Sequence, residues 1–276
     1  MSLHIQDIQP FINALKERSD YDFSNYSVKS LKRRLIRIMN TFRLDFTGLM
    51  EKIRNDDIFR EEVIKRIPVK TTGLFRDIDL WLQLKENILP AFSSKKRISV
   101  WHAGSSTGQE VYSMMILLNE LDLLDKTDIF ASDLNPDVLK ISREGIFEFF
   151  YNKEYLSTFD KVVNHNLSEN KISYEKYFRI DATKDQIIMN DFLREKPVYK
   201  KTDLVRDENP FKQKFDIIVC RNVIIYFNEE LQNRVFKILY HNLNEKGILV
   251  VGLYENITTE SESLFQKKGE MCYGKK

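Results

Sequence analysis

The chain has 276 residues, of which 30% are charged and 42% hydrophobic, and its formal net charge is +2. This length suffices for one large domain or for one domain with a smaller companion. Because the charge is nearly balanced, nothing attracts the whole chain to nucleic acid, and we expect no nucleic-acid partner.

Cysteine and histidine are too sparse for a disulfide framework or a cysteine-rich metal site. There are two cysteines, and the four histidines, His4, His102, His165 and His241, are scattered singly. We therefore predict no metal. No stretch reaches the apolar length of a membrane span, and the N-terminus, MSLHIQDIQP, has no signal-peptide pattern. We expect a cytoplasmic protein that does not insert into a membrane.

Residues 4–66 are predicted to be helical, because they show no strand-like alternation and contain one proline. One helix among them is amphipathic, with an apolar face formed by Leu31, Leu35, Ile38, Met39 and Phe42. The rest of this helix carries five cations and no acid: Lys29, Lys32, Arg33, Arg34 and Arg37. Such a face is either an ordinary solvated surface or a docking site for an acidic partner.

Residues 67–81, IPVKTTGLFRDIDLW, connect this helical part to a sheet domain. A proline and a glycine in this stretch indicate irregular backbone, and a helix is expected from Arg76 or Asp77 to about Ile88. Arg76 follows a Gly-Leu-Phe turn. It is either a surface charge or an arginine fixed in a cleft.

Residues 98–113, ISVWHAGSSTGQEVYS, predict a buried strand, a turn of small residues and a helix that continues to Leu118. Small residues allow backbone N–H groups and a helix start to approach a nucleotide-like ligand closely. The turn lacks the full G-x-G-x-x-G spacing, so a plain connection is the alternative.

A second strand is predicted at residues 127–132, and it ends at Asp133. Asn135 as a cap and Pro136 at the first helical position predict that a helix begins there. An acidic residue at the tip of the second strand is where α/β nucleotide-binding folds hold ribose hydroxyls. We therefore interpret Asp133 as a ribose ligand, rather than as a residue that only caps a turn.

Residues 151–201 are polar and aromatic, and do not form a clean strand–helix–strand unit. Short alternating runs, YFRI at 177–180 and QIIM at 186–189, indicate short antiparallel strands in an insertion. Thr202, Asp203 and Leu204 then follow the tip of a returning strand.

Residues 215–225, FDIIVCRNVII, are the most strand-like run of the chain, and predict a central parallel strand that is buried on both faces. Arg221 and Asn222 follow it at the carboxyl edge of the sheet, where open α/β folds bind their ligands. A helix from Asn228 or Glu229 and a strand at 247–252 come next. Residues 265–276 lack the strand-like pattern expected at the end of such a sheet.

Taken together, three stretches resemble one family: VWHAGSSTGQEVYS, FASDLNPDVL, and FDIIVCRNVIIYF followed by GILVVG. They are similar to the CheR-type chemotaxis receptor methyltransferases, which use S-adenosylmethionine to esterify glutamate side chains. The resemblance covers nearly the whole chain, and C-R-N-V-x-I-Y-F is its most specific run.

The resemblance implies an α/β fold: a Rossmann-like S-adenosylmethionine-dependent methyltransferase domain with a small β insertion, preceded by an all-α N-terminal domain. The implied bounds are 1–66 for the basic helical domain, 67–90 for the linker and first helix, and 91–276 for the methyltransferase domain. The β insertion would lie at about 151–201.

The resemblance also implies roles for single residues. Thr72 and Arg76 match linker residues that reach into the cofactor site. Glu110 matches the acid near the methionine amino end of S-adenosylmethionine, and Asp133 the ribose ligand. The remaining matches are Asp203 and Leu204 at the adenine, Arg221 and Asn222 past the central strand, and Tyr226 facing the methyl group.

The chain departs from the family pattern at several positions. Lys70 stands where the family usually has Asn, and it is expected at the cofactor. Gln109 and Val111 replace the usual Glu and Pro, and Asp203 occupies a common Asn position. The exit loop G-L-Y-E-N, with Leu253 and Tyr254, replaces the usual G-H-S-E. Lys70 and this loop bear on cofactor affinity and substrate identity.

The implied reaction needs no general base, because a glutamate carboxylate is already ionised at neutral pH. Our hypothesis is that Arg76 and Tyr226 orient this carboxylate, since the arginine fork matches its two oxygens. The basic helix, Lys29 to Arg37, would hold the helical, glutamate-rich segment of a chemotaxis receptor.

Two alternatives remain open from the sequence. A non-catalytic regulatory protein that binds S-adenosylmethionine or S-adenosylhomocysteine is suggested by the departures at Lys70 and in the exit loop. A nicotinamide-dependent oxidoreductase shares the glycine turn and the strand-end Asp133, but it does not explain the run from Arg221 to Phe227.

Overall fold

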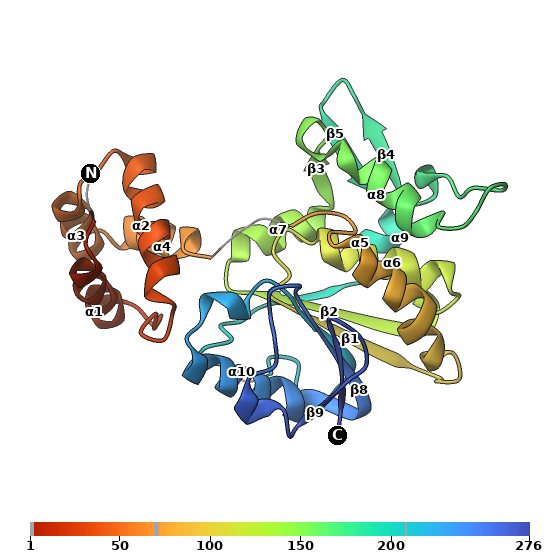
Figure 1. Cartoon of the computed structure of the whole chain (residues 1–276). Helices are drawn as coiled ribbons and strands as arrows, with labels where there is room; N and C mark the ends of the chain where they lie inside the picture. The colour runs from red at the N-terminus through yellow and green to blue at the C-terminus, as the bar shows by residue number, and fades with distance from the viewer. Residues whose placement is uncertain (1–2, 69–71, 208) are drawn as a thin grey trace. The chain divides into compact units, whose positions relative to one another are not determined.

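The computed structural model describes residues 3–68, 72–207 and 209–276. The chain forms two compact units (Figure 1). The helical unit comprises Met1–Val69 and Val223–Phe236, and the sheet unit comprises Lys70–Asn222 and Lys237–Lys276. The sequence-based division at residue 66 assigned Val223–Phe236 to the sheet domain, whereas the structure groups this segment with the N-terminal part of the chain.

The predicted helical character of the N-terminal part is confirmed. Its elements are η1 Ile5–Asp7, α1 Ile8–Arg18, α2 Val28–Phe42, α3 Phe46–Asn55 and α4 Asp57–Arg66. Leu31, Leu35, Ile38 and Met39 of α2 are buried in the core of this unit, as their spacing predicts. The apolar face of α2 therefore attaches it to the neighbouring helices, while its charged positions stay outside this core.

The second segment of the helical unit contains η7 Ile224–Tyr226 and the start of α10 Glu229–Asn242. Ser27 N donates a hydrogen bond to Tyr226 O at 2.8 Å, beside an antiparallel bridge between Tyr26 and Phe227. The rings of Tyr26 and Phe227 pack edge to face, with centroids 5.1 Å apart. The motif run that looks continuous in sequence is thus divided between the two units after Asn222.

The sheet unit is built on a sheet whose described strands follow the order β6-β2-β1-β7-β8-β10-β9. The strands are β1 Ile98–Ala103, β2 Thr127–Asp133, β6 Val198–Lys201, β7 Phe215–Cys220, β8 Leu243–Val251, β9 Phe265–Lys267 and β10 Cys272–Lys275. β6, β2, β1, β7 and β8 pair in parallel, and β10 pairs antiparallel with both β8 and β9. The strand order reverses between β1 and β7, so their carboxyl ends flank the switch point where open α/β sheets bind ligands.

The central strand ends at Cys220, with Arg221 and Asn222 past it as predicted, and the left-handed φ of 58° at Asn222 ends the extended backbone. One expectation about strands is corrected. The C-terminal tail is not irregular, since it forms β9 and β10. These strands have three and four residues, which is too short to show the alternation that predicts a strand.

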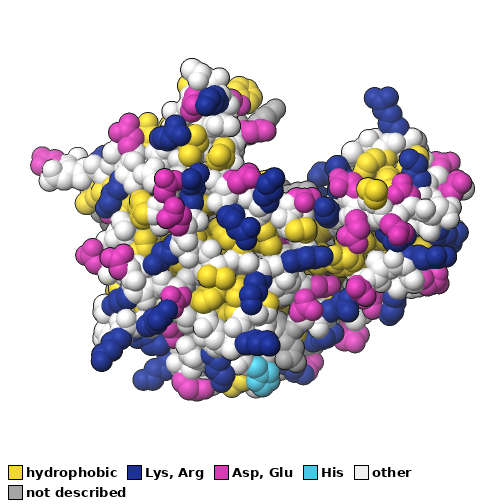
Figure 2. All heavy atoms as spheres, turned by 180° about the vertical axis from the view of Figure 1, so that it is seen from behind, with side chains coloured by type: hydrophobic (Ala, Val, Ile, Leu, Met, Phe, Trp, Pro, Cys, Tyr) yellow, Lys and Arg dark blue, Asp and Glu magenta, His cyan; other side chains and the backbone are white. Residues whose placement is uncertain are grey.

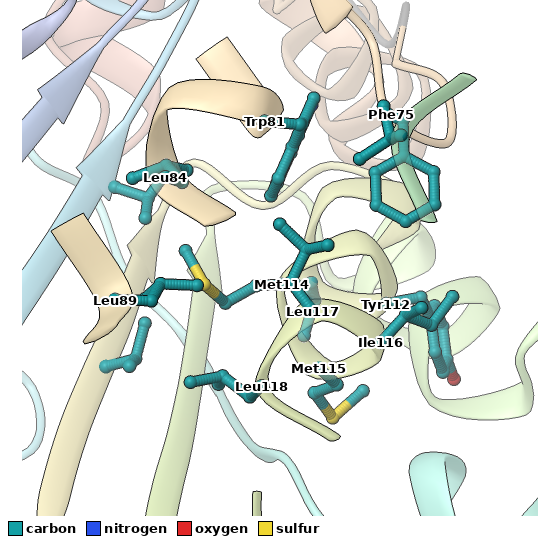
Figure 3. Packing of buried hydrophobic residues seen from close by; sticks show 14 of the residues in the cluster. Phe75, Trp81, Leu84, Leu89, Tyr112, Met114, Met115, Ile116, Leu117 and Leu118 are labelled. Carbon is teal, nitrogen blue, oxygen red and sulfur yellow. The ribbon is translucent and has the colours of Figure 1, made fainter. Parts of the chain in front are cut away.

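The sheet unit also contains helices, which lie before and between its strands in the chain. They are α5 Ile78–Gln83, the π-helical turn η2 Leu84–Ile88, η3 Leu89–Phe92, α6 Gln109–Glu120, η4 Leu124–Lys126, α7 Pro136–Glu144 and η8 Thr259–Ser261. Every residue of α6 from Val111 to Leu118 is buried. Figure 3 shows Phe75, Trp81, Leu84 and Leu89 arranged around the side chains of α6. α6 is therefore a core helix, and its N-terminus is held firmly at the end of β1.

A small subdomain is inserted between α7 and β6. It contains β3 Ile146–Glu148, η5 Phe150–Asn152, α8 Glu154–Val163, η6 Tyr174–Lys176, β4 Phe178–Asp181, β5 Gln186–Met189 and α9 Asp191–Arg194. Its strands form an antiparallel sheet in the order β3-β5-β4. The expected bounds of about 151–201 need correction: β3 precedes residue 151, and β6 belongs to the main sheet, because it pairs with β2.

None of the helices in the described part of the chain combines the length and the apolar character needed to span a membrane. On the face seen in Figure 2, Lys and Arg side chains lie interspersed with Asp and Glu, as a net charge of +2 leads one to expect.

Candidate active site

The loop between β1 and α6 turns sharply through left-handed residues. Gly104, Ser106 and Gly108 have φ angles of 85°, 50° and 93°. A Cβ atom on Gly108 would lie 1.9 Å from Oγ of Ser142 in α7, so both its conformation and its surroundings require glycine. The predicted strand, turn and helix are all present, and the turn packs directly against α7.

Backbone N–H groups of this loop hold the end of β2. Ser105 N donates to Ser132 O at 2.9 Å, and Ser106 N donates to Oδ2 of Asp133 at 2.9 Å. The other carboxylate oxygen of Asp133 accepts from Asn135 N, also at 2.9 Å. Asn135 caps α7, as predicted. The Asp133 carboxylate is therefore fixed at the tip of β2, between the loop and the start of α7.

Arg221 forms the centre of a buried ion network just past the end of β7. Its side chain is 1% exposed. Nη1 donates to Oε2 of Glu110 at 2.9 Å, and Nη2 donates to Oδ2 of Asp77 at 2.6 Å and to the main-chain oxygen of Arg76 at 3.2 Å. The guanidinium carbon lies 5.8 Å from the ring centre of Trp81. One side chain thus joins β7, α6 and the segment before α5.

His102 extends this network to β1. Its side chain is fully buried, and Nδ1 lies 3.1 Å from Oε1 of Glu110. Burial by itself raises the pKa of Glu110, but the hydrogen bond to His102 and the charge of Arg221 outweigh this effect and lower the pKa. Glu110 is therefore ionised at neutral pH, and Nδ1 of His102 carries the proton that it donates.

The segment around Arg76 has an unusual backbone. Phe75 and Asp77 have φ angles of 54° and 63°, and left-handed backbone at such residues costs on the order of 1–3 kcal/mol each. Phe75 N donates to Oγ of Ser113 at 2.8 Å, and Nε1 of Trp81 donates to Arg76 O at 2.8 Å. These contacts hold Arg76 between two left-handed residues. They also explain why α5 begins at Ile78 instead of at Arg76 or Asp77.

Glu255 joins the ends of β7 and β8. Its side chain is buried, and Oε2 accepts hydrogen bonds from Asn222 N and Gly252 N, both at 2.7 Å. A Cβ atom on Gly252 would lie 2.8 Å from Oε2 of Glu255. The close approach requires glycine, and the carboxylate holds Asn222 in its left-handed conformation.

Asp203 and Leu204 follow directly after β6. Thr202 N donates to Asp133 O at 3.0 Å, which continues the pairing of β6 with β2. Oδ1 of Asp203 accepts from Val205 N at 2.9 Å, and Leu204 is buried. Both residues thus lie at the same carboxyl edge as Asp133.

Two buried hydroxyl groups at this edge test whether S-adenosylmethionine fits. Oγ of Ser105 and Oγ1 of Thr202 have no hydrogen-bond partner within the described residues, although these residues are only 2% and 3% exposed. Buried hydroxyls normally have partners. Their main chains flank the tip of β2, where Asp133 is held. A ligand rich in hydroxyl and amino groups, such as an adenosine derivative, fits this donor set.

The structure gathers predicted site residues in two groups. Hydrogen bonds connect Arg221 with Glu110 and with the main-chain oxygen of Arg76, and Asn222 adjoins this network in sequence. Asp133 lies next to the strand that leads to Asp203 and Leu204. Thr72 is partly buried, and its side chain makes no hydrogen bond to these residues in the part of the chain that the structure describes. Lys70 lies outside the described residues, and Tyr226 belongs to the helical unit.

Three residues of the site were not predicted from the sequence: Asp77, His102 and Glu255. Each is a titratable residue in a turn or near a strand end, close to the sheet edge where a ligand was expected. That position is the signal by which the sequence could have indicated them. Among the described residues no three His, Cys, Asp or Glu side chains gather as a metal site, and the expected absence of a metal stays a prediction.

Family models match nearly the whole chain. The all-alpha domain of CheR methyltransferases matches residues 6–67, and their SAM binding domain matches residues 70–272. Cher3 of Pseudomonas putida, which is named as a methyltransferase, is 32% identical over 91% of this chain and 89% of its own length.

Relatives named for chemotaxis are also similar over most of their length. A chemotaxis protein methyltransferase of Listeria monocytogenes is 25% identical over 93% of this chain and 92% of its own. Chemotaxis protein methyltransferase 1 of Vibrio cholerae is 28% identical over 86% and 83%. With both family models matched in order, this chain belongs to the CheR family of S-adenosylmethionine-dependent methyltransferases.

Proposed function

We propose that this enzyme methylates glutamate side chains of a chemotaxis receptor and forms glutamate methyl esters. When bound, S-adenosylmethionine supplies an electrophilic methyl group attached to its sulfonium sulfur. The leaving group is the neutral thioether that this sulfur forms once the methyl group has gone. The acceptor carboxylate is ionised at neutral pH, because a glutamate pKa is near 4.3 in the absence of perturbation. The enzyme therefore has to align the carboxylate and exclude water from it, and alignment can contribute about 7–11 kcal/mol in ideal cases.

The network around Arg221 is the observation that carries this proposal. It fixes an ionised acid, Glu110, at the start of α6, and it fixes the backbone of Arg76 through the main-chain oxygen. We assign Glu110 to the amino group of the methionine part, because a buried carboxylate attracts an ammonium group. Arg221 and Asn222 would complete this end of the site.

The ribose and adenine are assigned to the other half of the edge. Asp133 presents a fixed carboxylate at the tip of β2, which suits a pair of ribose hydroxyls. Asp203 and Leu204 offer a polar and an apolar contact for the adenine. The roles of Thr72 and Lys70 at the cofactor rest on the resemblance alone.

Arg76 is proposed to orient the acceptor carboxylate. Its backbone is held between left-handed Phe75 and Asp77, and a guanidinium fork can bind both carboxylate oxygens at once. Tyr226 is proposed as its partner on the strength of the motif, four residues after Asn222. Tyr226→Phe tests this part separately, because it removes only the hydroxyl group.

The basic face of α2 is proposed to hold the receptor segment. Lys29, Arg33 and Arg37 are exposed and follow one another at intervals of four residues, so they form a line along the helix. Within the part of the chain that the structure describes, the cations of this face form no ion pair. A helical, glutamate-rich segment is the complementary partner.

The proposal is tested with methyl-labelled S-adenosylmethionine and a receptor fragment that carries glutamate-rich helices. We expect label on the fragment that alkali releases as methanol, since esters hydrolyse in alkali and N-methyl groups do not. Arg76→Ala is expected to lower kcat/KM about 100-fold, as misalignment of the reacting groups does. Arg54→Ala, at an exposed position of α3, is the matched control. Alkali-stable label, or full turnover in Arg76→Ala, would contradict the proposal.

A further inference from the structure

The turn after β8 exposes two large apolar side chains that are adjacent in sequence. Glu255 N donates to Gly252 O at 3.0 Å and closes a four-residue turn with Leu253 and Tyr254 at its tip. Leu253 is 42% exposed and Tyr254 is 77% exposed. Isolated exposed apolar residues are common and carry no meaning. This pair differs from them because the candidate site holds the turn in place.

Glu255 holds the turn against the end of β7. It is 4% exposed, and Oε2 accepts from Gly252 N and Asn222 N at 2.7 Å each. A Cβ atom on Gly252 would lie 3.0 Å from Asn222 N, so the two segments have no spare room between them. The turn therefore presents its tip in one geometry, and a partner that binds there does not have to order it.

We propose that Leu253 and Tyr254 bind an apolar side chain of the acceptor protein, within about one helical turn of the glutamate that is methylated. This proposal rests on the proposed function. The turn adjoins Asn222 at the carboxyl edge of the sheet, where the acceptor has to approach the methyl donor. The contact surface is thus continuous with the proposed site.

The chemistry of the tip selects an apolar partner. Neither side chain at the tip is charged, whereas the basic face of α2 matches the acidic residues of an acceptor. Tyrosine contributes a large rigid contact area at protein interfaces, where it is enriched among the residues that dominate binding. Tyr254 is 77% exposed, so it is available to a molecule that approaches from solvent, and we assign this contact to the acceptor.

Two synthetic, glutamate-rich helical peptides that differ at one residue test this proposal. The residue four positions after the methylated glutamate is Leu in one peptide and Ser in the other. At saturating labelled S-adenosylmethionine, we expect the wild-type enzyme to show a kcat/KM about tenfold higher for the Leu peptide, mainly through KM. The double variant Leu253→Ser with Tyr254→Ser is expected to lose this preference. Leu167→Ser, at a residue that is 40% exposed in the inserted subdomain, is the matched control and keeps it.

Calorimetric titration with S-adenosylhomocysteine separates contact with the acceptor from contact with the methyl donor. The double variant is expected to bind it within about twofold of wild type. An undiminished preference in the double variant overturns this inference and leaves the proposed function intact. Weaker binding of S-adenosylhomocysteine with an unchanged peptide preference also overturns it, because the tip would then serve the donor. Failure of the wild-type enzyme to esterify either peptide or the receptor fragment removes the proposed function and this inference together.

Discussion

The buried network around Arg221 and the basic face of α2 use the same kinds of charge in opposite surroundings. Arg221 is 1% exposed and is paired with Glu110 and Asp77 at 2.9 and 2.6 Å. Lys29, Arg33 and Arg37 are exposed and stand in a row of like charges. Buried charges must be paired to be tolerated, whereas exposed charges are screened by water and salt.

This difference implies different tasks. Removing one partner from the buried network leaves a charge without compensation in the interior, so the network determines local geometry and stability. A row of exposed like charges weakens an isolated helix by a few tenths of a kcal/mol per pair, so stability does not account for it. We expect changes in the network to alter folding and cofactor binding, and changes on α2 to alter only the encounter with an acidic partner.

The largest expected effect comes from Arg221→Met. This variant keeps much of the side-chain volume but leaves the mostly buried carboxylate of Glu110 and the partly exposed carboxylate of Asp77 without their cation, which costs about 3 kcal/mol. Urea unfolding followed by tryptophan fluorescence measures it, since both tryptophans, Trp81 and Trp101, lie in the sheet unit.

Arg97→Met is the control for this experiment. Arg97 pairs with Asp128, but its side chain is 78% exposed, and exposed pairs contribute little. We expect its free energy of unfolding to stay within about 0.5 kcal/mol of wild type. Equal losses in the two variants would show that burial does not distinguish the network from a surface pair.

Asp133→Ala is expected to have the next largest effect, on ligand binding. It removes the carboxylate that accepts from Ser106 N and Asn135 N and that we assign to the ribose. We expect about 100-fold weaker binding of S-adenosylhomocysteine by calorimetry, which corresponds to about 2.7 kcal/mol. Asp125→Ala, at an exposed position in η4, is the matched control. Unchanged affinity in Asp133→Ala would contradict the assignment of the ribose to this carboxylate.

The sheet edge could be predicted from the sequence because its signals are local. Buried strand residues, a small-residue turn and a strand-end acid each occupy one short stretch, and the rule for open sheets places Asp133 and Arg221 at the same edge. The family resemblance then supplied the name of the ligand. The helices of the N-terminal part and the cap at Asn135 were predicted correctly for the same reason.

What the sequence did not reveal depends on contacts between distant segments. Glu255 acts on Asn222 across 33 positions, and Asp77 meets Arg221 across 144. The left-handed backbone at Phe75 has no signal of its own, because such bulky residues rarely adopt it. The short strands β9 and β10 were missed because their pairing with β8, and not their own pattern, makes them strands.

A smaller effect is expected in the pH dependence of stability. The pKa of Glu110 is lowered in the folded protein from its ordinary value of 4.5, so the unfolded chain binds its proton first as the pH falls. The stabilisation is complete above about pH 5 and is lost as the pH falls from 4.5 through the lower folded value. Glu110→Gln removes this dependence, so the stability difference between wild type and variant should stay constant above about pH 5 and shrink as the pH falls below it. Glu245→Gln, at an exposed glutamate, should show no such change.

The smallest expected effect concerns the basic face of α2. Arg33→Glu with Arg34→Glu should raise the KM for the receptor fragment about tenfold at low salt and leave the affinity for S-adenosylhomocysteine unchanged, because we assign this face to the acceptor and not to the methyl donor. Added salt should raise the KM of wild type more than that of the variant, since screening weakens attraction between exposed charges. Arg18→Glu with Arg54→Glu changes the net charge equally at exposed positions of α1 and α3. If this control raises the KM as much, the total charge of the protein, rather than the row of cations on α2, attracts the acceptor. The basic face of α2 would then have no task of its own to contrast with that of the buried network.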